Sequence, residues 1–309
     1  MTLIAFGRHR TRDRPGPGPV PEAVLRAIEI KIARKIEGLL PGEQRSNSQG
    51  FGSELTTVRP YQPGDDVRRI EWKVTARTNQ PHVRVDIAEK SLTTWLVLDT
   101  SPSMGFGTGE RRKWDVAEGV ALAMGHLASR RGGRLAVMTY GSPDPQTIPA
   151  RSGRSGLRSV LAATHAMPRI EATGPTSLGA ALVRLAPIAS QRGLLVVVGD
   201  FRGHGDWQPP MAALAYKHQV VAIEISDPRE TEIPDVGEIV LVDPETGRQL
   251  RVDTGSEELR RRFVNAAEAE RQAVAAALNS IGVRHLVLST AGDWLRDLVV
   301  FLRRERRGW

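Results

Sequence analysis

From residue 93 onward, short apolar runs alternate with longer stretches whose pattern is typical of helices. A short, continuous apolar run is typical of a strand buried in a parallel sheet. We expect such strands at residues 93–99, 134–140, 193–199, 219–226 and 284–289. The stretches between and after them predict helices at residues 113–130, 154–166, 176–190, 208–217, 257–280 and 293–305. This alternation indicates an α/β fold, with a doubly wound, mostly parallel sheet that is covered by helices.

One segment interrupts the alternation. Residues 238–254 form two extended pieces around the turn sequence Glu245-Thr246-Gly247, which predicts a β-hairpin. We therefore expect one large domain over residues 93–309, with a hairpin insertion at about 227–256.

The first 92 residues have a different pattern. Residues 1–20 contain alternating proline and glycine and four arginines, which indicates a flexible basic arm. An apolar stripe at every fourth position from Val24 to Ile36 then predicts a helix that begins at Pro21 and stops at Pro41. Farther along, short β-prone pieces flank a polar centre in which neither a helical nor a strand period is visible. Residues 21–92 are thus predicted to be a separate helix-plus-β segment.

Composition and charge narrow the function classes. The sequence has no cysteine and no apolar run near the roughly 20 residues that a membrane-spanning helix needs, so we expect a cytoplasmic protein without a transmembrane segment. The net charge of +8 is concentrated at the ends, because residues 1–20 carry four arginines against one aspartate and the tail after residue 302 repeats this count. With only 5% aromatic residues, nucleic-acid binding is not expected for the body of the protein, although the basic ends leave weak binding to nucleic acid or to a membrane surface open.

Candidate chemistry begins at the first buried strand. The run from Trp95 to Met104 reads WLVLDTSPSM, in which Asp99, Ser101 and Ser103 follow one another at two-residue steps after the apolar strand. Ligand sites of open α/β sheets lie beyond the carboxyl ends of such strands. A carboxylate and two hydroxyls at that position offer the oxygen ligands that Mg²⁺ or Mn²⁺ prefers.

Two further loops are expected at the same edge of the sheet. Thr176 directly precedes a predicted helix, and Asp200 ends the apolar strand that starts at Leu194. The set of five oxygen ligands would leave one position open for a Glu or Asp from a protein partner, which would complete the charge balance. The alternative interpretation is that the hydroxyls cap helices and the acids bind loop amides.

Asp99, Ser101, Ser103, Thr176 and Asp200 together resemble the metal-ion-dependent adhesion site of von Willebrand factor A domains, over about residues 93–226. That resemblance implies a von Willebrand A-like, Rossmann-type fold. It also implies that the hydroxyls of the two serines and the threonine bind the ion, while the second aspartate acts through water.

A second resemblance concerns the polar segment from Arg59 to Arg77. Its sequence RPYQPGDDVRRIEW is similar to the signature of an uncharacterised bacterial family, domain of unknown function fifty-eight, and the similarity extends over about residues 40–290. It implies association with a MoxR-type AAA+ ATPase, but the transmembrane helices that many members carry are not found here, so membrane anchoring is not inferred. Structural roles and a partner-binding surface are both considered for five residues of this segment: Arg59, Asp65, Asp66, Arg68 and Trp72. For Trp72, as for Trp114, we expect a role as a packing anchor.

Most enzyme classes lack their motifs in this sequence. There is no P-loop, no GxSxG elbow and no paired histidine spacing, and Ser101 occupies the position where an aspartyl phosphotransferase needs a second acid. We therefore expect a non-enzymatic, metal-dependent adaptor that works with a MoxR-type ATPase in chaperone-like complex assembly. A metal-dependent hydrolase of phosphatase type, with Asp99 or Ser101 as nucleophile, is the alternative.

Overall fold

The computed structural model describes residues 56–86, 93–108, 111–129, 133–141, 145–152, 155–156, 177–203, 205–243 and 246–304. The predicted basic arm, the predicted helix after it and most of the helix predicted at 154–166 lie outside the described residues. The chain divides into two compact units, one of residues Leu40–Ser91 and one that contains Leu92–Trp309. Each unit is described by itself.

The larger unit is built on a six-stranded sheet with the order β10-β7-β6-β3-β4-β5. Its strands are β3 (Thr93–Asp99), β4 (Arg134–Tyr140), β5 (Thr147–Ser152), β6 (Leu194–Gly199), β7 (Gln219–Ser226) and β10 (Arg284–Ser289). All neighbours pair in parallel except β4 and β5. In order of appearance along the chain this is the doubly wound order 3-2-1-4-5-6. The predicted α/β fold with a mostly parallel sheet is confirmed.

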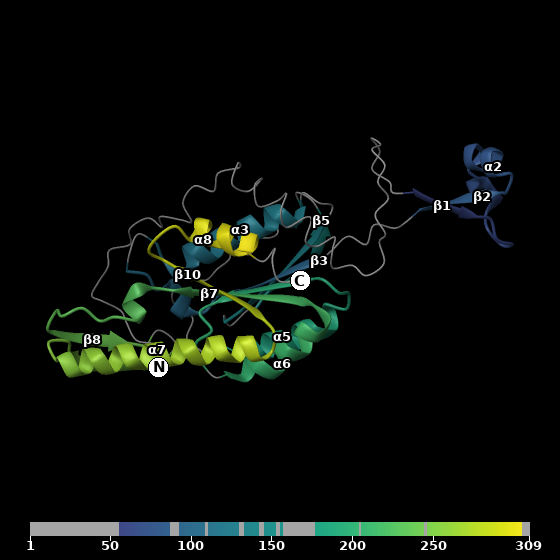
Figure 1. Cartoon of the computed structure of the whole chain (residues 1–309). Coiled ribbons are helices and arrows are strands. Elements are labelled where there is room, and N and C mark those ends of the chain that lie inside the picture. Colours follow the sequence, from purple (N-terminus) through teal and green to yellow (C-terminus); the bar gives the residue numbers. More distant parts are fainter. Residues whose placement is uncertain are drawn as a thin grey trace. The chain divides into compact units, whose positions relative to one another are not determined.

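Helices cover both faces of this sheet (Figure 1). The helices are α3 (Lys113–Ser129), α5 (Leu178–Ile188), α6 (Gln208–Lys217), α7 (Glu257–Ser280) and α8 (Trp294–Arg304). Apolar residues of α3 and α8 share one buried cluster with one face of the strands. Residues of α5, α6 and the end of α7 share a second cluster with the other face. Because the chain leaves β3 toward the first face and β6 toward the second, the strand ends of β3 and β6 border the crevice where such folds bind ligands.

The strand β5 was not predicted from the sequence. Its residues are mostly exposed or half-buried, and it contains Pro149, which cannot donate to a strand ladder. It is the antiparallel edge strand of the sheet, where a proline is tolerated and where no continuous apolar run is needed.

The predicted hairpin is present as β8 (Glu238–Val242) and β9 (Gln249–Asp253). It forms a small apolar cluster of its own, in which Leu241 and Ile233 are buried and Phe263 of α7 packs against them. None of the described helices is both long and apolar enough to cross a bilayer.

The smaller unit pairs β1 (Thr56–Pro60) with β2 (His82–Asp86) in antiparallel fashion. Between them lie a short 3-10 helix, η1 (Val67–Arg69), and the helix α2 (Trp72–Thr78). The sequence showed no helical period here because α2 has only seven residues, too few for an apolar stripe to repeat.

Candidate functional site

The site begins where β3 ends. Oδ1 of Asp99 accepts a hydrogen bond of 2.9 Å from the backbone N–H of Ser101, so the carboxylate shapes the turn that follows it. The 3-10 helix η2 (Pro102–Gly105) then presents Ser103, whose Oγ lies 2.9 Å from Oγ of Ser101. The three side chains belong to residues that are at most 2% exposed. The DxSxS spacing thus gathers its three oxygen-bearing side chains in one buried turn.

Asp200 reaches the same place from the end of β6. Oγ of Ser103 donates a hydrogen bond of 2.7 Å to Oδ2 of Asp200, although the two residues are 97 positions apart in the sequence. Strands β3 and β6 are hydrogen-bonded neighbours, which explains why their terminal acids meet. The structure therefore brings together four of the predicted site residues, Asp99, Ser101, Ser103 and Asp200.

The fifth predicted ligand, Thr176, lies outside the described residues. The next residue, Ser177, caps α5 by accepting a hydrogen bond of 2.9 Å from the N–H of Ala180. Its hydroxyl also donates to Oδ2 of Asp206 at 2.7 Å. Ser177 is thus the N-cap of α5, and the capping role considered for Thr176 stays a prediction.

A buried lysine completes the site and was not predicted from the sequence. Nζ of Lys113 lies 2.8 Å from Oδ2 of Asp200 and 2.7 Å from Oε1 of Glu230, and its side chain is 0% exposed. Burial alone would lower the pKa of Lys113, but the charges of Asp200 and Glu230 outweigh burial and raise it. A lysine at the first position of a helix is usually exposed to solvent. The apolar sequence after Lys113 was the one local sign that its side chain is buried.

The two aspartates have opposite electrostatic environments. Burial and the charge of Asp200 raise the pKa of Asp99 to about 7. Burial also acts to raise the pKa of Asp200, but the charges of Lys113 and Arg202 and the hydrogen bonds from Lys113 and Ser103 lower it to about 2. Asp200 is therefore a compensated anion, whereas Asp99 forms no ion pair with any cation of the described residues, although the charge of Lys113 acts to lower its pKa.

Two glycines make room for the Asp99 carboxylate. A Cβ on Gly141 would lie 2.9 Å from Oδ1 of Asp99 and 2.8 Å from the N–H nitrogen of Ser101. On the other side, a Cβ on Gly199 would lie 3.0 Å from Oδ2 of Asp99 and 2.4 Å from the hydroxyl oxygen of Tyr140. These contacts could not be predicted from the sequence, because they depend on the register between neighbouring strands.

The loop after Asp200 bends sharply. Phe201 has a φ of 54°, a left-handed conformation that is rare for a bulky residue, and its ring packs edge-on against Trp207 with centroids 5.8 Å apart. This bend lets the N–H of Arg202 donate to Oδ1 of Asp200 at 3.1 Å. Backbone strain of this kind persists where the surrounding structure holds it, often at functional sites.

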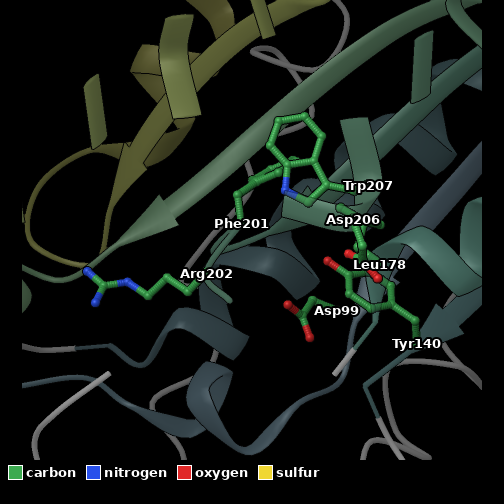
Figure 2. Close-up of a pocket in the computed structure, with 7 residues that line it drawn as sticks. All are labelled: Asp99, Tyr140, Leu178, Phe201, Arg202, Asp206 and Trp207. Atoms are coloured by element: carbon green, nitrogen blue, oxygen red, sulfur yellow. The ribbon is translucent and has the colours of Figure 1, made fainter. Parts of the chain in front are cut away.

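Asp99 lines a small pocket at this edge of the sheet. Its other lining residues are Tyr140, Leu178, Phe201, Arg202, Asp206 and Trp207. In Figure 2 the guanidinium of Arg202 extends away from Asp99, so it does not occupy the space next to the carboxylate. The pocket thus offers access to Asp99, which forms no ion pair within the described part of the chain.

These features fit a hard divalent cation. The site combines one under-compensated carboxylate with two hydroxyls and a second carboxylate, all oxygen ligands of the kind that Mg²⁺ prefers. Within the described part of the chain, no group of three or more histidine, cysteine or acidic side chains could hold a metal ion. A metal at this position would therefore depend on the serine hydroxyls as well as on the acids.

Three charged side chains of the signature segment make contacts within the segment itself. Arg59 forms two hydrogen bonds of 2.7 Å with the two carboxylate oxygens of Asp65, and Asp66 caps η1 through the N–H of Arg68 at 3.0 Å. These contacts give Arg59, Asp65 and Asp66 the structural roles considered above. Whether they also contact a partner stays a prediction.

Trp72 does not have the packing role that we expected. Its side chain is 70% exposed and nearby Val67 is 61% exposed, whereas Trp114 is 5% exposed and belongs to the main core. The anchor prediction is thus wrong for Trp72 and confirmed for Trp114. Trp72 starts α2 and has no buried neighbour on that helix, because α2 contains no buried residue.

Comparison with known proteins gives a family but no function. The family model described as "Protein of unknown function DUF58" matches residues 57–273. An uncharacterized protein of Mycobacterium bovis is 41% identical over 288 residues, which cover 93% of this chain and 90% of that protein. An uncharacterized protein of Mycobacterium avium is 40% identical over 163 residues, or 52% of this chain and 95% of that protein.

Two solved structures are similar at low identity. The conserved hypothetical protein BatB from Bacteroides thetaiotaomicron has 12% identity and a TM-score of 0.43, with 71% of this chain and 100% of that chain covered. The VWA domain of SpRpn10 has 15% identity and a TM-score of 0.37, with 68% of this chain and 94% of that chain covered. The fold assignment rests on the strand order of the protein itself.

Proposed function

The chain belongs to the family described as "Protein of unknown function DUF58", and we propose that it is a metal-dependent protein-interaction adaptor whose binding site is the edge of the sheet around Asp99. Asp99, Ser101, Ser103 and Thr176 would hold Mg²⁺, and Asp200 would act through water, as the resemblance to the metal-ion-dependent adhesion site implies. Mn²⁺ can replace Mg²⁺, since both favour oxygen ligands. When bound, the ion supplies a positive charge and a coordination position for an acidic side chain of a partner protein.

The observation that carries this proposal is the meeting of the two strand ends. Ser103 links Asp99's turn to Asp200 through a hydrogen bond of 2.7 Å, and the charge of Asp200 raises the pKa of Asp99. Two buried carboxylates whose charges act on each other favour a bound cation, because like charges in a desolvated site repel each other. Lys113 already compensates Asp200, so the remaining demand for positive charge lies at Asp99.

A binding role fits this electrostatic arrangement better than hydrolysis does. The hydrolase alternative has Asp99 or Ser101 as nucleophile, and a nucleophilic serine needs an adjacent base. The hydroxyl of Ser101 lies 2.9 Å from that of Ser103, which in turn donates to Asp200. The pKa of Asp200, about 2, makes it a poor proton acceptor near neutral pH. We therefore propose that the protein is not an enzyme.

The proposed partner is a MoxR-type AAA+ ATPase. This part of the proposal comes from the resemblance of the segment around Gly64-Asp65-Asp66 to its family, together with a site that suits an acidic side chain. The adaptor would act with the ATPase in chaperone-like assembly of other complexes.

A capture experiment tests the proposal. The purified protein is immobilised and incubated with a MoxR-type ATPase from the same genome, in Mg²⁺ and in excess EDTA. We expect capture in Mg²⁺, its loss in EDTA, and its loss for Asp99→Ala and Ser101→Ala variants whose circular dichroism spectra match the parent. Equal capture in EDTA would reject the metal-dependent role.

A further inference from the structure

Lys113 is a buried cation next to the proposed metal site. Its ammonium group has no lone pair, so it is not a metal ligand. It is the first residue of α3, and its ammonium group contacts two carboxylates from two other segments, Asp200 after β6 and Glu230 after β7. The cost of desolvating two buried charges cancels much of their Coulomb attraction. The presence of a buried ion pair therefore does not by itself show that the pair stabilises the fold. A role in setting the charge of the neighbouring site is a physical alternative.

Glu230 holds Lys113 in place from the far side. Its Oε2 accepts a hydrogen bond of 2.9 Å from the N–H of Asp227, in a capping box that closes the 3-10 helix η4 (Pro228–Glu230). The side chain of Asp227 is itself fixed by the hydroxyl of Thr290 at 2.5 Å. Glu230 therefore cannot follow a movement of Lys113 toward or away from Asp200 without breaking this cap.

The charges next to the site then balance in pairs. Lys113 faces Asp200 at 2.8 Å, and Arg202 faces Oε2 of Glu230 at 3.7 Å. Asp99 receives hydrogen bonds from Ser101 and is influenced by the charge of Lys113, but no cation of the described residues forms an ion pair with it. A divalent ion near Asp99 would thus keep one positive charge that these contacts do not neutralise.

We propose that Lys113 is a positioning residue that holds Asp200 back from direct metal coordination and so makes the bound ion selective for an acidic partner side chain. This inference rests on the proposed function of the same site. Oδ2 of Asp200 already receives hydrogen bonds from Lys113 and Ser103, which leaves this oxygen little capacity to bind a metal directly. Asp200 thereby lowers the charge of the site less than a direct carboxylate ligand does, and a partner's carboxylate supplies the difference.

The proposal predicts opposite effects from two neutralising substitutions. In Lys113→Met, Asp200 loses its counter-charge and can attract the ion fully, so we expect Mg²⁺ to bind about tenfold more tightly. In Glu230→Gln, the whole charge of Lys113 falls on Asp200, so we expect Mg²⁺ to bind several-fold more weakly. Damage to the fold would weaken binding in both variants, which separates it from the proposed role.

Isothermal titration with Mg²⁺ measures these affinities on the full chain, and circular dichroism checks that each variant is folded. Lys217→Met is the matched control, because Lys217 is an exposed lysine that precedes β7, at the opposite edge of the sheet, and it should leave the affinity unchanged. Acetate, titrated into Mg²⁺-saturated protein and followed by NMR, is the probe for a partner carboxylate. We expect it to bind the parent protein more tightly than Lys113→Met.

The outcomes separate this inference from the function on which it rests. If the parent protein binds Mg²⁺ but folded Lys113→Met binds it equally or more weakly, the role of Lys113 is rejected and the metal site stands. If Lys113→Met does not fold, Glu230→Gln decides, and unchanged or tighter binding in that variant rejects the role. If the parent protein binds no Mg²⁺, the proposed function fails and this inference fails with it.

Discussion

The hydroxyl of Ser103 donates a hydrogen bond of 2.7 Å to Oδ2 of Asp200, and this contact joins the loop after β3 to the loop after β6. It spans the point at which the chain switches from one face of the sheet to the other. Since Lys113 donates to the same oxygen at 2.8 Å, one carboxylate oxygen connects the predicted site residues to a buried cation.

Removing this hydroxyl tests the link between the two loops. Ser103→Ala should reduce the free energy of unfolding by only about 1 kcal/mol, the usual net value of one hydrogen bond, yet abolish stabilisation by Mg²⁺. Thermal unfolding with and without Mg²⁺ measures both effects. Ser256→Ala is the control, because Ser256 caps α7 through the N–H of Leu259 and its loss costs a similar amount. Equal Mg²⁺ stabilisation in the two variants would contradict the role of Ser103.

The raised pKa of Asp99 predicts how the metal-free protein responds to pH. In the unfolded chain the pKa of Asp99 has its ordinary value of 3.8, whereas in the folded protein it is about 7. The folded state therefore binds more protons between these values, and its stability falls as pH rises from about 4 to 7. Asp99→Asn removes this pH dependence. Between pH 5 and pH 8, the free energy of unfolding of the variant should therefore rise relative to that of the parent protein, by about a few kcal/mol at most for such a pKa difference.

Urea unfolding at several pH values in EDTA measures this difference. The lowered pKa of Asp200 acts only below its ordinary value of 3.8, so it does not disturb this window. At pH 8, Mg²⁺ should restore stability to the parent protein and leave Asp99→Asn unchanged. Parallel stability curves for the two proteins would show that Asp99 is not the group responsible.

Gly199 leaves the space in which Asp99 and Tyr140 approach each other. In Gly199→Ala, the new methyl group would lie 2.4 Å from the hydroxyl oxygen of Tyr140 and 3.0 Å from Oδ2 of Asp99. We expect a loss of about 1–3 kcal/mol from overpacking and a weaker affinity for Mg²⁺, because the carboxylate must shift. In the control Gly205→Ala, the added methyl group would lie 3.1 Å from the flexible amide end of Gln208. Similar effects in both variants would reject the specific role of Gly199.

Trp72 offers a test of the signature segment that does not involve the metal. Because its side chain is 70% exposed, Trp72→Ala should change stability by no more than about 0.5 kcal/mol. If this surface contacts the ATPase, capture in Mg²⁺ should fall several-fold, since exposed tryptophans often contribute much of the energy of an interface. Tyr216→Ala is the control, an aromatic residue of α6 that is 96% exposed. Unchanged capture by Trp72→Ala would assign no partner contact to this residue.

Much of the fold and the central site follow from local sequence. Strands β3 and β6 contain uninterrupted apolar runs, at residues 95–98 and 194–198, and the DxSxS turn and Asp200 follow them. The rule that ligands bind beyond the carboxyl ends of parallel strands is then enough to bring Asp99 and Asp200 together. Each of the two acids is recognised from the apolar strand directly before it, and the order of the strands in the sheet places the two strand ends next to each other.

Other parts depend on contacts that sequence does not record. Lys113 looks like a solvated helix start until Asp200 and Glu230 approach it from two separate loops. Gly199 and Tyr140 meet only because β3 lies between their strands in a specific register. The helix α2 is too short to show a period, and β5 has neither an apolar run nor regular alternation.

The most direct test of the metal site is a crystal structure of the protein grown with Mn²⁺, in which anomalous scattering locates the ion. We expect one peak between Asp99, Ser101 and Ser103, with Asp200 still paired with Lys113 and one coordination position held by water or by an acidic side chain of a neighbouring molecule. A structure at saturating Mn²⁺ with no peak at these oxygens, or with the ion bound elsewhere, would contradict the account.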